Sequence, residues 1–165
     1  MPKRAEVSQK IKETVLRNKD MVYRLAYSQM KNKDDADDVF QEVFCRYIKK
    51  QQKFNSAEHE KAWFIRVTLN CCKTAVTSFW KTRVEELDEN TEMPEVERYE
   101  LEFALNQLPK KYNAVLHLFY YEDLSAEEIA AVLKTSTANV RMLLTRARRA
   151  LKEILERSEG YEKSL

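Results

Sequence analysis

The chain has 165 residues, of which 34% are charged and 44% hydrophobic, a balance typical of soluble proteins. One Gly and three Pro predict helix almost throughout, so we expect an all-α fold. No apolar run reaches the length of a membrane span, and no apolar segment follows MPKRAEVSQK, which predicts a cytoplasmic protein with no membrane insertion of its own.

Charge is segregated along the chain. Residues 1–83 carry 18 Lys and Arg against 10 Asp and Glu, residues 84–107 carry 1 against 9, and residues 108–165 carry 10 against 8. The acidic stretch 84–97 contains Pro94 and shows no sustained period, which predicts a flexible linker. We therefore expect two small helical domains, residues 1–83 and 98–165, on either side of this linker.

The cysteines and histidines do not form a recognisable site. The three cysteines are Cys45, Cys71 and Cys72. They cannot make a disulfide framework, and together with the two histidines they lack the spacing of a zinc site. Buried thiols that pack as small hydrophobes are the favoured interpretation. No residue set forms a nucleophile, an acid–base pair or a metal site, so we expect no catalysis and no cofactor.

Two amphipathic helices are expected first, one over residues 9–30 and one that begins at Asp34, a possible N-cap. Their inward-facing residues are Ile11, Val15, Val22, Leu25, Ala26, Ala36, Val39, Phe40, Val43, Phe44 and Tyr47. The outer side of the second helix carries a polar ridge, which consists of Asp37, Asp38, Gln41 and Glu42. From the residues alone, a solvated face is the favoured interpretation of this ridge.

Periodicity is lost over residues 51–60, which predicts a loop with Phe54 as an exposed aromatic residue. A third helix is expected to begin near residues 56–61 and to run through AWFIRVTLNCCKTAVTSFWK. Its expected buried face is Phe64, Ile65, Leu69, Cys72, Val76 and Phe79, and its outer basic residues are Lys61, Arg66, Lys73, Lys81 and Arg83. Aromatic residues interleaved with Lys and Arg are typical of a surface that stacks unpaired bases, and equally of an aromatic core beside a solvated basic face.

The second domain is expected to contain four helices. The first covers residues 98–107, and Pro109 predicts the first position of the next, because its missing N–H costs little there. The apolar residues of this next helix are Tyr112, Val115, Leu116, Phe119 and Tyr120. A third helix begins with a capping box of Ser125 and Glu128, and Ser136 offers the N-cap of a fourth.

The last two helices are separated by a turn of three residues, 134–136, and their apolar positions share one side. These positions are Ile129, Val132, Leu133, Val140, Leu144, Ala147, Leu151 and Ile154. The other side of the fourth helix forms a recognition face, which consists of Thr137, Ala138, Arg141, Met142, Thr145, Arg146 and Arg149. This pattern predicts a helix-turn-helix that reads the DNA major groove, where Arg can bind guanine or phosphate. The alternative is an ordinary helical hairpin with a solvated basic face.

Three segments, in order, resemble one known family. They are DDADDVFQEVFCRYIKK, AWFIRVTLN, and the stretch from ALNQLPKKYNAVLHLFYYEDL to the end of the helix-turn-helix. The chain is similar over almost its whole length to small bacterial sigma factors of the extracytoplasmic-function group. The D-A-x-D-x-x-Q-E and L-P-x-x-Y elements are specific in combination.

The resemblance implies a non-enzymatic subunit that gives core RNA polymerase its promoter specificity. Polymerase binding would fall on Asp38, Gln41 and Glu42. Recognition and melting of the proximal promoter element, with a flipped base held in the loop Phe54 to Glu60, would fall on Phe54, Asn55, Ser56, Trp63, Arg66, Asn70 and Lys73. The recognition face would read the distal promoter element, the acidic linker would enter the RNA channel of the polymerase, and an anti-sigma protein is a further implied partner.

The sequence departs from the family pattern at a few positions. Lys134 stands where Gly is usual in the turn, Leu143 replaces a commonly basic residue, and Thr74, Thr77 and Ser78 stand in place of acidic and basic residues. The runner-up function is a stand-alone helix-turn-helix regulator that binds duplex DNA as a dimer, and a third is a protein-binding helical module. The polar ridge discriminates, because a repressor has no use for it.

Overall fold

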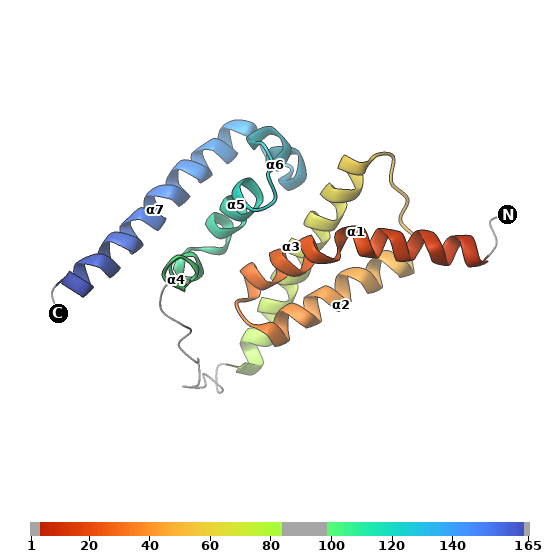
Figure 1. Cartoon of the computed structure of the whole chain (residues 1–165), viewed down its shortest axis with the longest axis horizontal. Helices are drawn as coiled ribbons and strands as arrows, with labels where there is room; N and C mark the ends of the chain where they lie inside the picture. Colours follow the sequence, from red (N-terminus) through yellow and green to blue (C-terminus); the bar gives the residue numbers. More distant parts are fainter. Residues whose placement is uncertain (1–3, 84–98, 164–165) are drawn as a thin grey trace. The chain divides into compact units, whose positions relative to one another are not determined.

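The computed structural model describes residues 4–83 and 99–163, and all seven elements in these ranges are α-helices (Figure 1). The helices group into two compact units, Met1–Lys81 and Thr82–Leu165. The all-α prediction is therefore confirmed for the described ranges. The predicted linker, residues 84–97, lies outside them.

The first unit contains α1 (Arg4–Met30), α2 (Lys33–Lys50) and α3 (Ala57–Arg83). α1 and α2 pack against each other as a hairpin. Its turn holds Lys31 at a φ of 67°, and the Lys31 N–H donates to the carbonyl of Tyr27 at 2.8 Å. The Asn32 side chain, not Asp34, caps α2, because its Oδ1 accepts from the backbone N–H of Asp35 at 2.8 Å. The N-cap therefore lies two residues before Asp34, the predicted position. The structure also begins α1 five residues before its predicted start.

The core of the first unit is built from the apolar stripes of all three helices. Its fully buried side chains include Val22, Leu25, Val39, Val43, Phe64 and Ile65. The predicted inward residues Ile11, Val15, Phe40 and Leu69 are only half-buried. The side chains of Val76 and Phe79, as well as those of Lys81 and Arg83, lie outside the described set.

The second unit contains α4 (Tyr99–Gln107), α5 (Lys110–Tyr120), α6 (Ala126–Leu133) and α7 (Thr137–Lys163). α7 packs against the other three helices of the unit. Leu118, Ile129, Val140 and Ala147 are fully buried between them. Pro109 is the N-cap of α5, not its first residue, and Tyr120 is 55% exposed rather than part of the core. Tyr120 occupies the last position of α5, where less of the unit covers it.

Local signals determine the α6–α7 hairpin. The capping box is present: the Glu128 N–H donates to Ser125 Oγ, and the Ser125 N–H donates to Glu128 Oε1, both at 3.1 Å. Lys134 takes the left-handed conformation (φ 56°, ψ 48°) that ends α6. Ser136 Oγ accepts from the Asn139 N–H at 3.1 Å and caps α7. The predicted turn of residues 134–136 is confirmed.

Candidate functional site

The recognition face lies on the first four turns of α7. Val140, Leu144 and Ala147 are buried on one side of the helix. On the other side the exposed residues are Ala138, Arg141, Met142, Thr145, Arg146 and Arg149, whereas Thr137 is half-buried. Since the two sets alternate at helical spacing, packing of the buried side presents the basic side to solvent. The structure therefore brings together the side chains that the sequence assigned to DNA contact.

Arg141 is held before any DNA is bound. Its Nη2 donates to Oε1 of Glu127 on α6 at 2.8 Å, and both side chains are more than half exposed. Ion pairs this exposed contribute about 0–1 kcal/mol to stability, so a phosphate or a guanine can replace Glu127 as the partner. The sequence did not signal this contact, because Glu127 looked like an ordinary first-turn carboxylate.

The polar ridge on α2 is exposed at Asp38, Gln41 and Glu42 and half-buried at Asp37. Glu42 accepts from Nε of Arg46 at 2.9 Å, one turn further along, and this hydrogen bond raises the pKa of the Arg46 guanidinium. Asp35, by contrast, is buried and bound by the Asn32 side chain at 2.7 Å. The acidity of α2 thus divides into a structural residue at the cap and a ridge that is open to a partner.

The α2–α3 loop, residues 51–56, is tied down by an aromatic cluster of Tyr47, Phe54, Trp63 and Phe64. The Phe54 ring stacks on Tyr47 with centroids 6.1 Å apart and an interplanar angle of 14°. Trp63 is only 9% exposed, and Phe54 is half-buried. The prediction of Phe54 as an exposed aromatic residue was wrong, because its ring packs against aromatic side chains of α2 and α3. In this conformation Trp63 supports the loop rather than offering a face to a base.

Hydrogen bonds close the loop onto the first turn of α3. The Asn55 N–H donates to Nδ1 of His59 at 3.1 Å, and the His59 N–H donates to Ser56 Oγ at 3.1 Å. Ser56 is therefore the N-cap of α3. The side chains of Asn55 and Ser56 remain exposed at the end of the loop that meets α3. The sequence placed the start of this helix near residues 56–61, and the structure places it at Ala57.

Arg66, Asn70 and Lys73 follow one another at spacings of four and three residues and so share a face of α3. Asn70 and Lys73 are exposed, and Arg66 is half-buried. Thr74 Oγ1 donates to the backbone carbonyl of Asn70 at 3.1 Å, so this hydrogen bond does not use the Asn70 amide side chain. Next to them Cys71 is buried, and burial raises the pKa of its thiol. Cys72 is buried as well, so both agree with the interpretation as packing residues, but Cys45 is exposed and the prediction of a buried thiol was wrong there.

Comparison with known proteins matches both units. The family model described as Sigma-70 region 2 matches residues 14–82, and the one described as Sigma-70, region 4 matches residues 98–151. Among curated relatives, RNA polymerase sigma factor SigV of Bacillus subtilis is 32% identical over 79% of this chain and 81% of its own length. ECF RNA polymerase sigma factor SigM of the same species is 31% identical over 86% of this chain and 92% of its own length. The chain is an extracytoplasmic-function sigma factor by family.

Two further comparisons extend this assignment. ECF RNA polymerase sigma factor SigE of Mycolicibacterium smegmatis is 33% identical over 87% of this chain, which spans 60% of that relative's length. A solved structure of the sigma factor RpoE from Bartonella quintana, in complex with the anti-sigma factor NepR, covers 90% of this chain and 98% of its own, with a TM-score of 0.70 and 21% identity. This last likeness concerns the fold. The sigma-factor family is thus supported by sequence and fold together, against the reading as an unrelated regulator.

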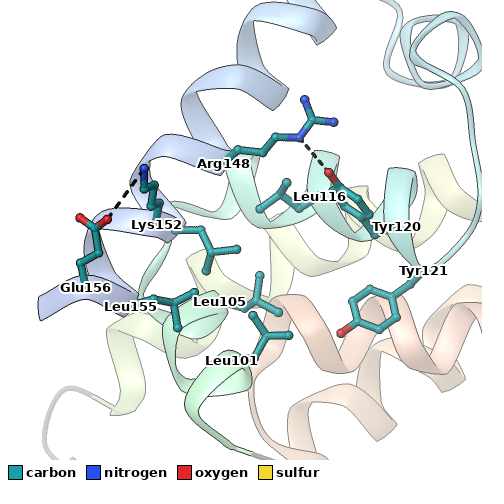
Figure 2. Close-up of a pocket in the computed structure, with 10 residues that line it drawn as sticks. Leu101, Leu105, Leu116, Tyr120, Tyr121, Arg148, Lys152, Leu155 and Glu156 are labelled. Atoms are coloured by element: carbon teal, nitrogen blue, oxygen red, sulfur yellow. Dashed lines mark hydrogen bonds and ion pairs between the residues drawn. The ribbon is translucent and has the colours of Figure 1, made fainter. Parts of the chain in front are cut away.

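In the sigma factor, the polar ridge, the α2–α3 loop and Asn70 all fall within region 2, and the helix-turn-helix falls within region 4. Region 4 also contains a feature that we did not predict from the sequence, an apolar groove of about 550 Å³ between α4, α5 and α7 (Figure 2). It is lined by Leu101, Leu105, Leu116, Tyr120, Tyr121, Arg148, Leu151, Lys152, Leu155 and Glu156. On its rim Nε of Arg148 donates to the Tyr120 hydroxyl at 2.8 Å (Figure 2). The repeats of Leu at four-residue spacing in α4 and α7 were the available signal for this groove.

No helix in the described part of the sigma factor is both long and apolar enough to cross a membrane. Within the same residues, no group of three or more His, Cys, Asp or Glu side chains could hold a metal ion.

Proposed function

We propose that this sigma factor binds core RNA polymerase through the polar ridge of α2 and directs it to promoters. The observation that carries the proposal is the exposure of Asp38, Gln41 and Glu42 on one side of a helix whose other side is buried. A row of acidic and amide groups favours a basic or polar protein partner and repels DNA. A regulator that binds duplex DNA alone would gain nothing from this surface.

The proposed path on DNA divides between the two units. Arg141, Met142, Thr145 and Arg146 read the distal promoter element in the major groove, where Arg discriminates guanine by about 1–3 kcal/mol. The α2–α3 loop holds one base of the proximal element after it leaves the stack, and Asn70 contacts the neighbouring strand. Unstacking a base costs about a few kcal/mol. The polar groups at the end of the loop therefore favour opening of the duplex only where they can form hydrogen bonds with the right base.

The sigma factor takes no part in the chemistry of RNA synthesis, which belongs to the polymerase, and the proposed function locates the chain with that enzyme in the cytoplasm. An anti-sigma protein is a further proposed partner, in analogy to the NepR complex of the Bartonella protein. The proposed domain limits are residues 1–83 for region 2, 84–97 for the linker and 98–165 for region 4, close to the matched ranges 14–82 and 98–151.

Reversal of charge on the ridge tests the proposal. The double variant Asp38→Lys and Glu42→Lys should lose co-migration with core RNA polymerase on a sizing column, because it places two cations where two carboxylates are expected to bind. The matched control is the double variant Glu6→Lys and Asp20→Lys, which reverses two exposed carboxylates on α1. If the ridge variant still co-migrates as the wild type does, polymerase docking through the ridge is wrong. A twofold complex with a palindromic duplex, without polymerase, would favour the stand-alone regulator.

A further inference from the structure

Glu60, in the first turn of α3, receives three hydrogen bonds from α1. Arg17 Nη2 donates to Oε1 at 2.9 Å and Arg17 Nε donates to Oε2 at 3.1 Å, while Nδ2 of Asn18 donates to Oε2 at 3.2 Å. The guanidinium therefore grips the carboxylate with both arms of its fork, a geometry that restrains position as well as charge. The partners are 43 and 42 residues apart in sequence.

The donors are themselves oriented by α1. Arg17 Nη2 also donates to Thr14 Oγ1 at 3.2 Å, and Asn18 Nδ2 donates to the Thr14 carbonyl at 2.8 Å. Thr14 and Asn18 are buried polar residues of α1. The Arg17 hydrogen bond, opposed by burial and aided by Asn18, lowers the pKa of the Glu60 carboxyl. The carboxylate is therefore ionised at neutral pH and fully engaged.

This clamp acts directly on the base of the α2–α3 loop. The Glu60 N–H donates to the Ser56 carbonyl at 3.1 Å, and Ser56 is the residue that ends the loop and caps α3. The preceding Asn55 is closed onto His59, and Phe54 is packed in the aromatic cluster. The loop thus has an apolar anchor on α2 and α3, and its far end is fixed to α1 through Glu60.

Stability alone is a weak account of this arrangement. The Arg17 side chain is 56% exposed, and ion pairs with one exposed partner contribute little to the free energy of folding. Their larger effect is geometric, because a bidentate pair restricts where the carboxylate, and the backbone that carries it, can lie. A pocket that discriminates bases needs such restriction, since small displacements of contacting groups remove its selectivity.

We infer that Arg17 and Asn18, through Glu60, are positioning residues that hold the α2–α3 loop in the shape that selects the unstacked base. The inference rests on the proposed function of that loop. It adds a determinant on α1, outside the loop and outside any DNA-contacting face described above.

The test uses holoenzyme assembled from core RNA polymerase and the full chain. Duplex promoters randomised in the proximal element are transcribed, and sequencing of the transcripts gives the base preference at each position. A second library carries the same element pre-melted by a mismatched template strand. Arg17→Gln and Glu60→Gln should flatten the preference at the captured base by about tenfold in both libraries. Lys12→Gln removes an equivalent exposed charge from α1 and should leave the preference unchanged.

A general loss of folding would lower transcription from all library members alike and leave the preference intact. Exchange of the pair, Arg17→Glu with Glu60→Arg, should restore part of the preference, and Arg17→Lys should retain less than half of it because it keeps the charge without the fork. Circular dichroism and assembly with core polymerase verify folding, and Arg17→Lys decides the question if Arg17→Gln fails to fold.

Asn55→Ala and Asn70→Ala in the same assay separate the two levels of the argument. If both of these variants leave the preference unchanged, base capture by the loop is wrong. If they flatten it while folded Arg17→Gln and Glu60→Gln holoenzymes keep the wild-type preference, the loop captures the base and the clamp inference alone is overturned.

Discussion

At the scale of single residues, the arginine that we propose for promoter contact already has a partner within the chain. Arg141 is paired with Glu127 across the helix-turn-helix, at 2.8 Å, in the DNA-free chain. The pair orients the guanidinium near the surface that we propose for DNA contact, and its exposure makes it easy to replace. The Glu127 carboxylate on α6 and the acceptors of DNA would therefore compete for Arg141.

Substitution of Arg141 and substitution of Glu127 should have different effects on promoter binding. Arg141→Ala should weaken specific promoter binding by holoenzyme by about 1–3 kcal/mol, because a bidentate contact to a base is lost. Glu127→Gln should leave binding unchanged or slightly tighter, since the competing carboxylate is gone. Electrophoretic mobility shift with promoter DNA measures both, and Arg157→Ala, an exposed arginine further along α7, is the matched control. Equal binding by Arg141→Ala and wild type would remove Arg141 from the reading role.

Glu60 gives region 2 a pH-dependent contribution to stability. Its pKa in the folded chain is lowered, mainly by the Arg17 hydrogen bond. A lowered folded-state pKa means that the stabilisation is present above the unfolded pKa and is lost as pH falls through the folded pKa. The stabilisation by Glu60 is therefore lost under acidic conditions, as the pH falls below the ordinary carboxyl pKa.

The corresponding comparison is between wild type and Glu60→Gln. At neutral pH the free energy of unfolding of the variant should be lower by about 0.5–1 kcal/mol, a small value because the pair is partly exposed. The variant should therefore unfold at a lower urea concentration. At pH 3, below the ordinary glutamate pKa, the difference should shrink, because the unfolded wild-type chain then binds a proton that must be released for the ion pair to form. Urea denaturation followed by circular dichroism measures it. A difference that stays constant between pH 7 and pH 3 would contradict an ionised Glu60 in the folded chain.

At the scale of elements, the α6–α7 turn depends on one backbone conformation. Lys134 ends α6 at a φ of 56°, a region that Gly enters freely and that other residues enter at a cost of about 1–2 kcal/mol. The Thr135 N–H then donates to the Ala130 carbonyl at 3.0 Å, which closes the end of the helix. Because α7 starts three residues later, this conformation sets the direction in which the recognition face points.

The same substitution should therefore have opposite signs at two lysines. Lys134→Gly should stabilise the second unit by up to about 1 kcal/mol, because relief of the left-handed strain exceeds the added entropy of the unfolded chain. Lys152→Gly, in the interior of α7, should destabilise it by about 1 kcal/mol. Thermal unfolding followed by circular dichroism compares the two. Destabilisation by both changes would mean that the Lys134 side chain contributes more than its backbone costs.

At the scale of the whole molecule, the balance of basic and acidic residues differs between segments of the sigma factor. The net charge of the chain is only +2, yet residues 1–83 carry 18 basic against 10 acidic residues, whereas residues 84–107 carry 1 against 9. Basic surfaces bind phosphates and release counterions, so DNA affinity should depend steeply on salt. An acidic connector does not compete for the same DNA, since like charges repel.

The salt dependence can be assigned to residues. The logarithm of holoenzyme affinity for promoter DNA should fall by about 0.9 units per tenfold rise in salt for each neutralised phosphate. Arg146→Gln with Arg149→Gln should reduce this slope by about two units, one for each exposed guanidinium that binds a phosphate. Filter binding over a series of potassium chloride concentrations gives the slope, and Arg157→Gln serves as the control. An unchanged slope in the double variant would place the phosphate contacts on other residues.

Most of the recognition helix and of the polar ridge was predictable from sequence. Capping by Ser125 and Ser136, the left-handed Lys134 and the buried stripe of α7 depend on residues within one or two turns of each other. The site around the α2–α3 loop was predicted less well. Phe54 was expected at the surface and instead packs on Tyr47, and the Arg17–Glu60 clamp was not anticipated at all.

The sequence by itself determined the helical class, the positions of the helices, and which side of α7 carries its arginines, because capping, turn chemistry and periodicity act between near neighbours along the chain. Only the tertiary structure decided that Phe54 joins a core, that Tyr120 does not, and that Glu60 is gripped from α1. These outcomes depend on which distant segments pack together, since a side chain's burial and its ion-pair partner are properties of the surroundings that three-dimensional packing creates.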